Sequence, residues 1–185
     1  MMNKLSILAL GIAAITSSAN AFATTDRTGF YVGGEIGAIE AKEGGESESG
    51  QSFGAYGGYN FNDWFGLEAT LYGTNDLADN DFASVNAAAF SVAPKFTVVL
   101  NDTFSLYGKV GVSSVAVVID SAFRDVDYSG YGVTVGAGVN AALTESLNLR
   151  LGYDYTNVDL DSDDFGAADF DVDLSRFTLG MHYQF

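Results

Sequence analysis

The stretch "LNLRLGYDY", residues 147–155, alternates large apolar side chains with small, polar or charged ones. A period of two is typical of a β-strand that has one apolar face and one polar face. Arg150 and Asp154 lie inside the run, so the polar face carries charge in the middle of the strand. This pattern predicts a strand but leaves open whether its apolar face meets a protein core or lipid.

The same alternation recurs along the chain in eight runs. The runs are Phe30–Glu40, Gln51–Phe61, Trp64–Thr74, Ser84–Leu100, Thr103–Ile119, Tyr128–Leu143, Leu147–Val158 and Asp171–Phe185. Tight joints of turn-forming residues alternate strictly with long acidic links, "AKEGGESESG", "NDLADND", "DSAFRDVD" and "DLDSDDFGAADF". All long links therefore lie at one end, and the sequence predicts an all-β, eight-stranded antiparallel up-and-down barrel. Such a barrel is either a soluble carrier of an apolar ligand or a transmembrane β-barrel.

The N-terminus predicts export from the cytoplasm. Residues 1–23 carry Lys4, an apolar run from Leu5 to Ile15, and small residues before a cleavage site, as a secretory signal peptide does. The apolar run is too short for a membrane-spanning helix, which needs about 20 residues. We therefore expect a signal peptide over residues 1–23 and one barrel domain over residues 24–185.

Charge restricts the partners. The net charge of −16 argues against nucleic acid, because phosphate backbones attract basic surfaces. Seventeen of the twenty-four acidic residues fall in the long links and the adjoining strand tips. Asp159, Asp161 and Asp163 imitate the start of a calcium loop, but the turn glycine and the closing glutamate are missing. We interpret the links as solvated surface and predict neither a metal site nor a cofactor.

Two features favour a membrane barrel over a soluble one. The terminal run "FTLGMHYQF", residues 177–185, approaches the ~9–11 residues with which a tilted strand crosses a bilayer. Aromatic residues gather toward both ends of the predicted strands, as in the two belts of a membrane barrel. The expected belts are Phe61, Trp64, Phe65, Phe104, Tyr183 and Phe185 at the short-turn end, and Tyr72, Tyr128, Tyr131, Tyr153 and Tyr155 at the other. The apolar faces should then point to lipid and the polar faces should fill the lumen. Pro94 cannot donate to a ladder, so we expect a bulge there.

Several segments together resemble a known family. "FGLEATLYG", "APKFTVVLNDTFSLYGKVG" and "GAGVNAALTESLNLRLGYDYTNV", with the aromatic last strand, are similar to the small outer-membrane barrels typified by the OmpA transmembrane domain, OmpX and Ail. The resemblance implies a Gram-negative outer membrane, with both termini in the periplasm and lipid and lipopolysaccharide as surroundings. It also implies that the last strand, with Tyr183 and Phe185, is the signal read by the barrel-assembly machinery.

The resemblance further implies an ionic network in the lumen. The matching positions are Glu68, Lys95, Lys109 and Arg150. Asn140 stands where the family's network has a second glutamate, so a gate that exchanges a cation between two carboxylates lacks one of them here. Glu35 and Asp154, both expected to point inward, are candidates to replace it.

An eight-stranded barrel is just wide enough to be filled by its own side chains. This favours a packed plug, and hence a structural role in membrane integrity with loops that bind a surface or host ligand, as the resemblance implies. The alternative is a narrow or gated channel for ions or small solutes. The one histidine, His182, has no visible catalytic partner, so no catalytic residue and no enzyme activity are predicted.

Overall fold

The computed structural model describes residues 27–43, 46–75, 79–80, 83–121, 125–162 and 170–185. Every regular element in these ranges is a β-strand. None of the described segments forms a helix long and apolar enough to cross a membrane. The predicted signal peptide, residues 1–23, lies outside the described residues and stays a prediction.

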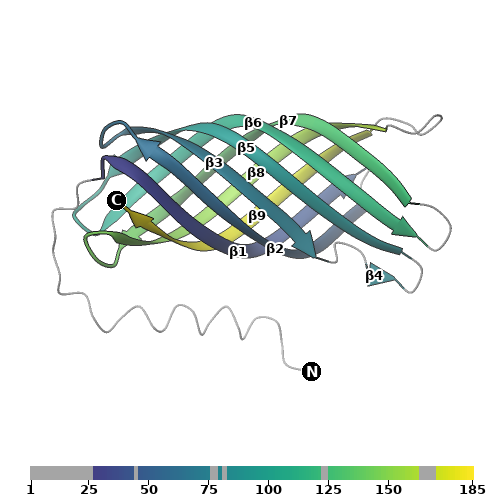
Figure 1. Cartoon of the computed structure of the whole chain (residues 1–185), viewed down its shortest axis with the longest axis horizontal. Coiled ribbons are helices and arrows are strands. Elements are labelled where there is room, and N and C mark those ends of the chain that lie inside the picture. Colours follow the sequence, from purple (N-terminus) through teal and green to yellow (C-terminus); the bar gives the residue numbers. More distant parts are fainter. Residues whose placement is uncertain (1–26, 44–45, 76–78, 81–82, 122–124, 163–169) are drawn as a thin grey trace, which may run out of the picture.

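Eight long antiparallel strands close into a barrel (Figure 1). They are β1 (Gly29–Glu43), β2 (Glu46–Asn60), β3 (Phe65–Asn75), β5 (Ala83–Val99), β6 (Phe104–Ser121), β7 (Asp125–Ala142), β8 (Leu147–Ser162) and β9 (Phe170–Gln184). Each strand pairs with its neighbours in sequence, β1 pairs with β9, and β3 pairs with β5. The two-residue β4 (Asp79–Asn80) adds only a short pairing with β5. The predicted eight-stranded up-and-down barrel is confirmed.

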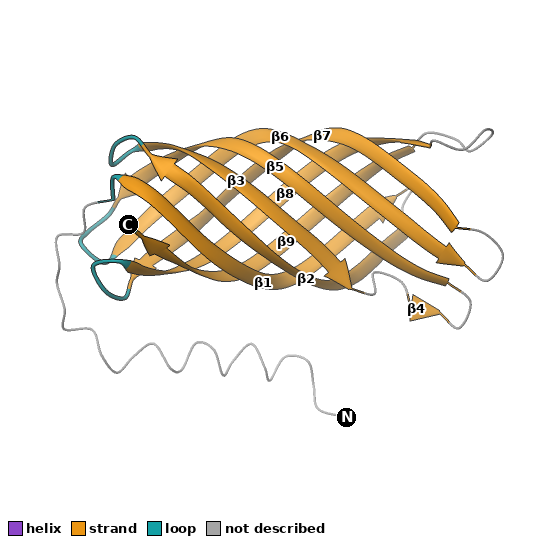
Figure 2. Cartoon of the chain, viewed as in Figure 1, coloured by secondary structure: helices purple, strands orange, loops and turns teal. Residues whose placement is uncertain are grey.

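The short turns and the C-terminus share one end of the barrel (Figure 2). Asn62 and Asn101 close two of these turns by accepting hydrogen bonds from backbone N–H groups two and three residues on, as Asx turns do. The last strand is fixed at this end, because the Phe185 N–H donates to the Phe30 carbonyl. We call this end the turn end and the opposite one the loop end.

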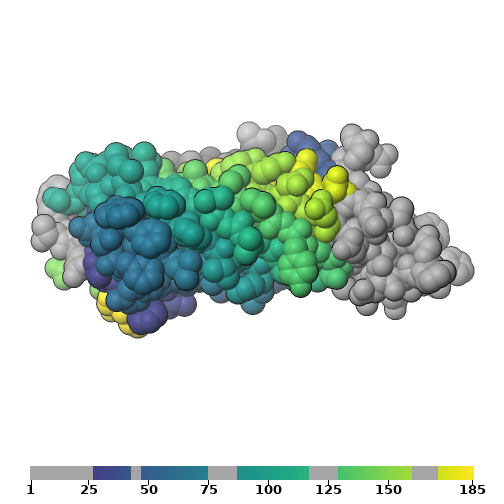
Figure 3. All heavy atoms as spheres, turned by 90° about the horizontal axis from the view of Figure 1, so that it is seen from above, coloured from purple at the N-terminus to yellow at the C-terminus, as the bar shows by residue number. Residues whose placement is uncertain are grey.

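The alternation correctly predicts the two faces of the sheet: large apolar side chains lie on the outer wall and polar or charged ones point into the lumen. Leu151 on β8 is 43% exposed on the outer wall, whereas its neighbour Arg150 is 2% exposed. Large apolar side chains are exposed around the whole barrel, among them Phe30, Ile36, Leu71, Phe96, Val112, Val133, Phe177 and Met181. Figure 3 shows how side chains from many strands form this wall. A wall of this kind is far larger than the apolar patches of soluble proteins.

Three expectations about local structure were wrong. The acidic links are shorter than predicted, because β1 continues to Glu43 and β2 begins at Glu46. Strand pairing uses the backbone, so it extends past the apolar pattern into acidic sequence. Pro94 causes no shift in register: Val92↔Val112 and Lys95↔Lys109 are in phase, and the β5–β6 ladder is only interrupted between them. Tyr72 points inward, 7% exposed, so it is absent from the outer belt.

Candidate functional site

The lumen brings the four predicted network residues together. Glu68 on β3 is the shared carboxylate and is 1% exposed. Its Oε2 lies 2.7 Å from Arg150 Nη1 on β8 and 3.9 Å from Lys95 Nζ on β5. Its Oε1 lies 3.2 Å from Lys109 Nζ on β6. Three successive long strands, β3, β5 and β6, and the distant β8 are therefore connected through one carboxylate.

A second group of charges continues the network toward the loop end. Lys109 Nζ also lies 3.1 Å from Asp154 Oδ1 on β8. Asp154 Oδ2 lies 2.8 Å from Arg176 Nη2 on β9, and Arg176 Nη1 lies 2.6 Å from Glu35 Oε1 on β1. Lys109 thus joins the Glu68 group to the Asp154 group, and cations and carboxylates alternate along the lumen.

Tyrosines surround the cations. Tyr31 donates from Oη to Glu68 Oε2 at 2.7 Å, and accepts from Lys95 Nζ at 2.7 Å. The Arg150 guanidinium lies 4.2 Å from the ring centroid of Tyr56 and 4.5 Å from that of Tyr107. Cation–π contacts of this kind stabilise a cation most strongly where water is excluded. The rings therefore provide part of the solvation that these cations lose on burial.

Asn140 and Gly136 on β7 adapt the wall to this network. Asn140 accepts from Arg150 Nε at 3.0 Å, so a neutral amide occupies the position where the family resemblance has a carboxylate. A Cβ placed on Gly136 would lie 2.2 Å from Asp154 Oδ1 and 2.7 Å from Lys109 Cε. The missing side chain at Gly136 is what leaves room for the Lys109–Asp154 pair.

The members of the ionic network depend on one another. Among the described residues, four cations (Lys95, Lys109, Arg150 and Arg176) pair with three carboxylates (Glu35, Glu68 and Asp154), and all seven are buried. Removing one partner from a buried pair leaves an uncompensated charge, which costs far more than the pair itself contributes. The arrangement therefore fixes the register of several strands at once.

An apolar layer fills the lumen between the network and the loop end. It contains Ile39, Tyr72, Ala87, Ala89, Val115, Val158, Val172 and Leu174. Val158 is 0% exposed and Val115 is 1% exposed. The expectation that polar groups fill the lumen was wrong at this level: on β9 the inward positions beyond Arg176 are Leu174 and Val172, and on β8 Val158 follows Thr156. A mainly apolar layer thus lies next to the ionic one.

A small polar recess lies at the turn end, with a volume of about 30 Å³. Lys95, Asn148 and His182 are among the residues that line it. His182 faces the lumen, and its Nδ1 lies 3.0 Å from Tyr56 Oη. This places the one histidine within the packed polar interior. The recess is large enough for about one water molecule.

The described residues contain no group of three or more metal-ligating side chains. Asp163 and the side chain of Asp161, from the calcium-like stretch, lie outside the described part of the chain. At the outer rim, Asp173 accepts hydrogen bonds from Tyr155 at 2.6 Å and from Asn157 at 2.9 Å. These contacts hold neighbouring side chains of β8 and β9 together on the outer surface.

The C-terminal aromatic residues lie on the outer wall at the turn end. Phe185 is 73% exposed, and its ring meets that of Tyr183 edge to face at 5.1 Å. At the same end, the ring of Trp64 stacks with that of Phe96. The two terminal rings are thus placed in the aromatic belt of this end.

Sequence reasoning missed some members of the network. The inward position of Arg176 followed from alternation, but its pairing with Glu35 and Asp154 depends on how far neighbouring strands are staggered. Tyr31, Tyr56 and Tyr107 shared the inward parity of the network, and that parity was the signal that could have identified them.

Comparisons with known proteins agree with this geometry. Residues 7–185 match the family model described as outer membrane protein beta-barrel domain. A 22 kDa outer membrane protein of Rhizobium leguminosarum bv. viciae is 30% identical over 158 residues, which cover 82% of this chain and 71% of that protein. Neisserial surface protein A has a similar structure, with a TM-score of 0.74, 18% identity and coverage of 85% of this chain and 98% of that one. Ail of Yersinia pestis also has a similar structure, with a TM-score of 0.62 and 20% identity, and the match covers 85% of this chain and 99% of that one.

Proposed function

The chain belongs to the family of outer membrane protein β-barrel domains, and we propose that it is a closed, non-catalytic barrel of the outer membrane. Its role is to reinforce the membrane and to present acidic outer tips to ligands at the cell surface. In this proposal, residues 1–23 are removed as a signal peptide and both termini face the periplasm. Tyr183 and Phe185 form the part of the last strand that the barrel-assembly machinery recognises.

The side chains that occupy the lumen are the observation that supports a structural role over a channel. The ionic network fills the middle of the barrel, and the apolar layer follows it toward the loop end. A small ion would have to displace buried charge pairs and then pass a layer of mainly apolar side chains that replaces little of its hydration. Both steps oppose conduction.

The charge of the outer tips defines the kind of surface ligand. Ail of Yersinia pestis has been solved in complex with a heparin analogue, sucrose octasulfate, which is a polyanion. Here seventeen of the twenty-four acids lie in the long links and strand tips, and Lys42 and Arg124 are the basic residues there. Like charges repel, so this chain should favour cationic ligands, or divalent ions that bridge it to lipopolysaccharide.

Reconstituted protein provides the test. In planar bilayers the barrel should give no stable conductance steps, because the lumen is closed. Immobilised on a sensor, the same preparation should bind poly-lysine in a salt-dependent way and should not bind heparin. A variant with Asp171 and Asp173 changed to Asn should bind poly-lysine more weakly, while Asp63→Asn and Asp102→Asn at the turn end serve as the matched control.

Two results would overturn the proposal. Long-lived openings would contradict the closed lumen and favour the channel alternative. Heparin binding as strong as poly-lysine binding would contradict the acidic surface role.

A further inference from the structure

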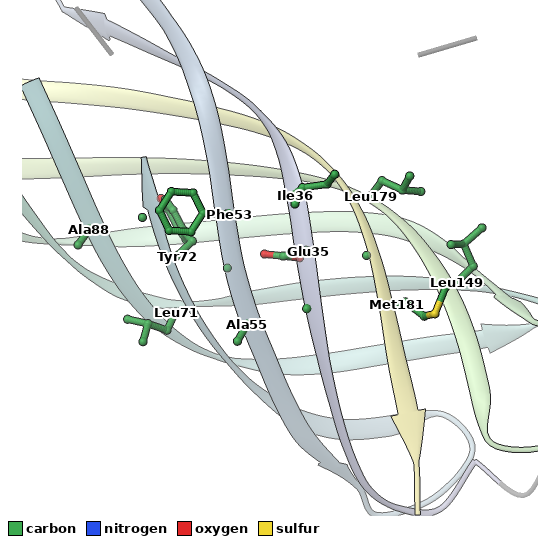
Figure 4. Close-up of a pocket in the computed structure, with 14 residues that line it drawn as sticks. Glu35, Ile36, Phe53, Ala55, Leu71, Tyr72, Ala88, Leu149, Leu179 and Met181 are labelled. Atoms are coloured by element: carbon green, nitrogen blue, oxygen red, sulfur yellow. The ribbon is translucent and has the colours of Figure 1, made fainter. Parts of the chain in front are cut away.

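The outer wall carries a wide apolar groove of about 850 Å³ (Figure 4). It crosses β8, β9, β1, β2, β3 and β5 along the direction of the inter-strand hydrogen bonds. Paired positions trace it across the sheet: Gly34↔Ala55 and Ala55↔Leu71 in one row, and Phe53↔Gly73 and Gly73↔Ala88 in the next. The groove is therefore a feature of the outer surface and is separate from the lumen.

Small residues form the floor of this groove. A Cβ built on Gly34 would meet no atom closer than 3.7 Å, and one built on Gly73 none closer than 3.6 Å. At both glycines a Cβ would thus make only ordinary van der Waals contacts, with the Gly54 carbonyl beside Gly34 and with the Phe53 ring beside Gly73. They differ from inward glycines such as Gly136, where a Cβ would meet a neighbouring side chain at 2.2 Å. A side chain added at Gly34 or Gly73 would therefore occupy part of the groove without a backbone clash at its Cβ.

The rim of the groove is hydrocarbon. Ile36 is 65% exposed, Leu71 is 58% exposed and Met181 is 44% exposed. The polar side chains behind the floor face the other way: Glu35 pairs with Arg176 in the lumen, and the Tyr72 ring lies under the Arg176 guanidinium. An occupant would therefore be held by apolar burial and dispersion alone.

We propose that the groove holds an acyl chain of a membrane lipid, and that this lipid stays with the barrel when bulk lipid is removed. The family places this wall in the outer membrane, so hydrocarbon chains are the molecules that meet it. A flexible chain can follow a concave floor of small residues between large side chains. A second copy would present a convex wall with no free sheet edge, because the barrel is closed. This inference is independent of the surface role proposed above.

Native mass spectrometry tests the assignment. The barrel is refolded into vesicles of phosphatidylethanolamine and phosphatidylglycerol, extracted in mild detergent, and examined for retained lipid. The double variant Gly34→Leu/Gly73→Leu fills the floor. Gly108→Leu is the matched control, because Gly108 on β6 lies outside the groove and its Cβ would meet nothing closer than 3.9 Å. Heat-modifiable migration on gels verifies that each variant is folded.

We expect the wild type and Gly108→Leu to retain one lipid per barrel. The double variant should retain it roughly tenfold less. Three outcomes would overturn the proposal: a wild type free of lipid, equal retention by all three proteins, or a dimer that the double variant abolishes, which would assign the groove to a second copy.

Discussion

Glu68→Ala should lower the free energy of unfolding by about 3–5 kcal/mol, the range found when one partner of a buried ion pair is removed. Glu68 is the shared partner of Arg150, Lys109 and Lys95. Among the described residues Arg150 and Lys95 form ion pairs with no other carboxylate, so the removal of Glu68 leaves two buried cations without a counter-charge. The measurement is urea unfolding in lipid vesicles, followed by the fluorescence of Trp64, which is the single tryptophan.

Three further variants separate the effect of charge from that of side-chain volume. Glu68→Gln keeps the volume and should lose most of the same stability, whereas Glu145→Ala in an exposed turn should change little. Adding Arg150→Met to Glu68→Gln removes the cation closest to the lost carboxylate and should restore part of the loss. Unchanged urea midpoints for both Glu68 variants would show that the Glu68–Arg150 pair contributes nothing.

Leu151→Arg should cost about 2–4 kcal/mol in a bilayer, because it places a charge on the lipid-facing wall near mid-membrane. Leu151 is 43% exposed and is paired with Val139 on one side and Leu179 on the other. The neighbouring residue, Arg150, is stable because it points the opposite way, toward Glu68. An arginine at position 150 therefore pairs with a carboxylate, whereas an arginine at position 151 would face hydrocarbon.

The same vesicles and the same urea titration provide the controls. Leu151→Ala measures the loss of apolar volume without added charge. Leu100→Arg, at the turn end, places the same charge near the interface, where it should cost about 0–1 kcal/mol. If Leu100→Arg were as costly as Leu151→Arg, the effect would not come from membrane depth.

The period of two predicted the number of strands and the direction of their side chains. Both depend on local sequence, because the alternation within one strand assigns each residue to a face of the sheet whatever the neighbouring strands are. The inward positions of Glu68 and Arg150 were predicted in this way, and the family resemblance suggested that they belong to one network.

What sequence could not provide depends on the stagger between strands. Whether Arg176 pairs with Glu35, with Asp154 or with both is decided by how β1, β8 and β9 are shifted along one another. The apolar layer was missed for a related reason: Ile39, Val115 and Val158 belong to separate runs and share one level only in the closed barrel. The lipid-facing groove likewise appears only when Gly34 and Gly73 come together across three strands.

The central claim is that the apolar side chains contact lipid while the charged ones lie within the barrel. The chain has no cysteine, so Leu151→Cys and Asn157→Cys can each carry a single nitroxide label on the same outward face of β8. In vesicles, electron paramagnetic resonance should find the Leu151 label accessible to oxygen and shielded from a water-soluble nickel chelate. The Asn157 label, nearer the loop end, should be accessible to nickel. A Leu151 label that is immobile and shielded from both reagents, as in a packed interior, would contradict the account.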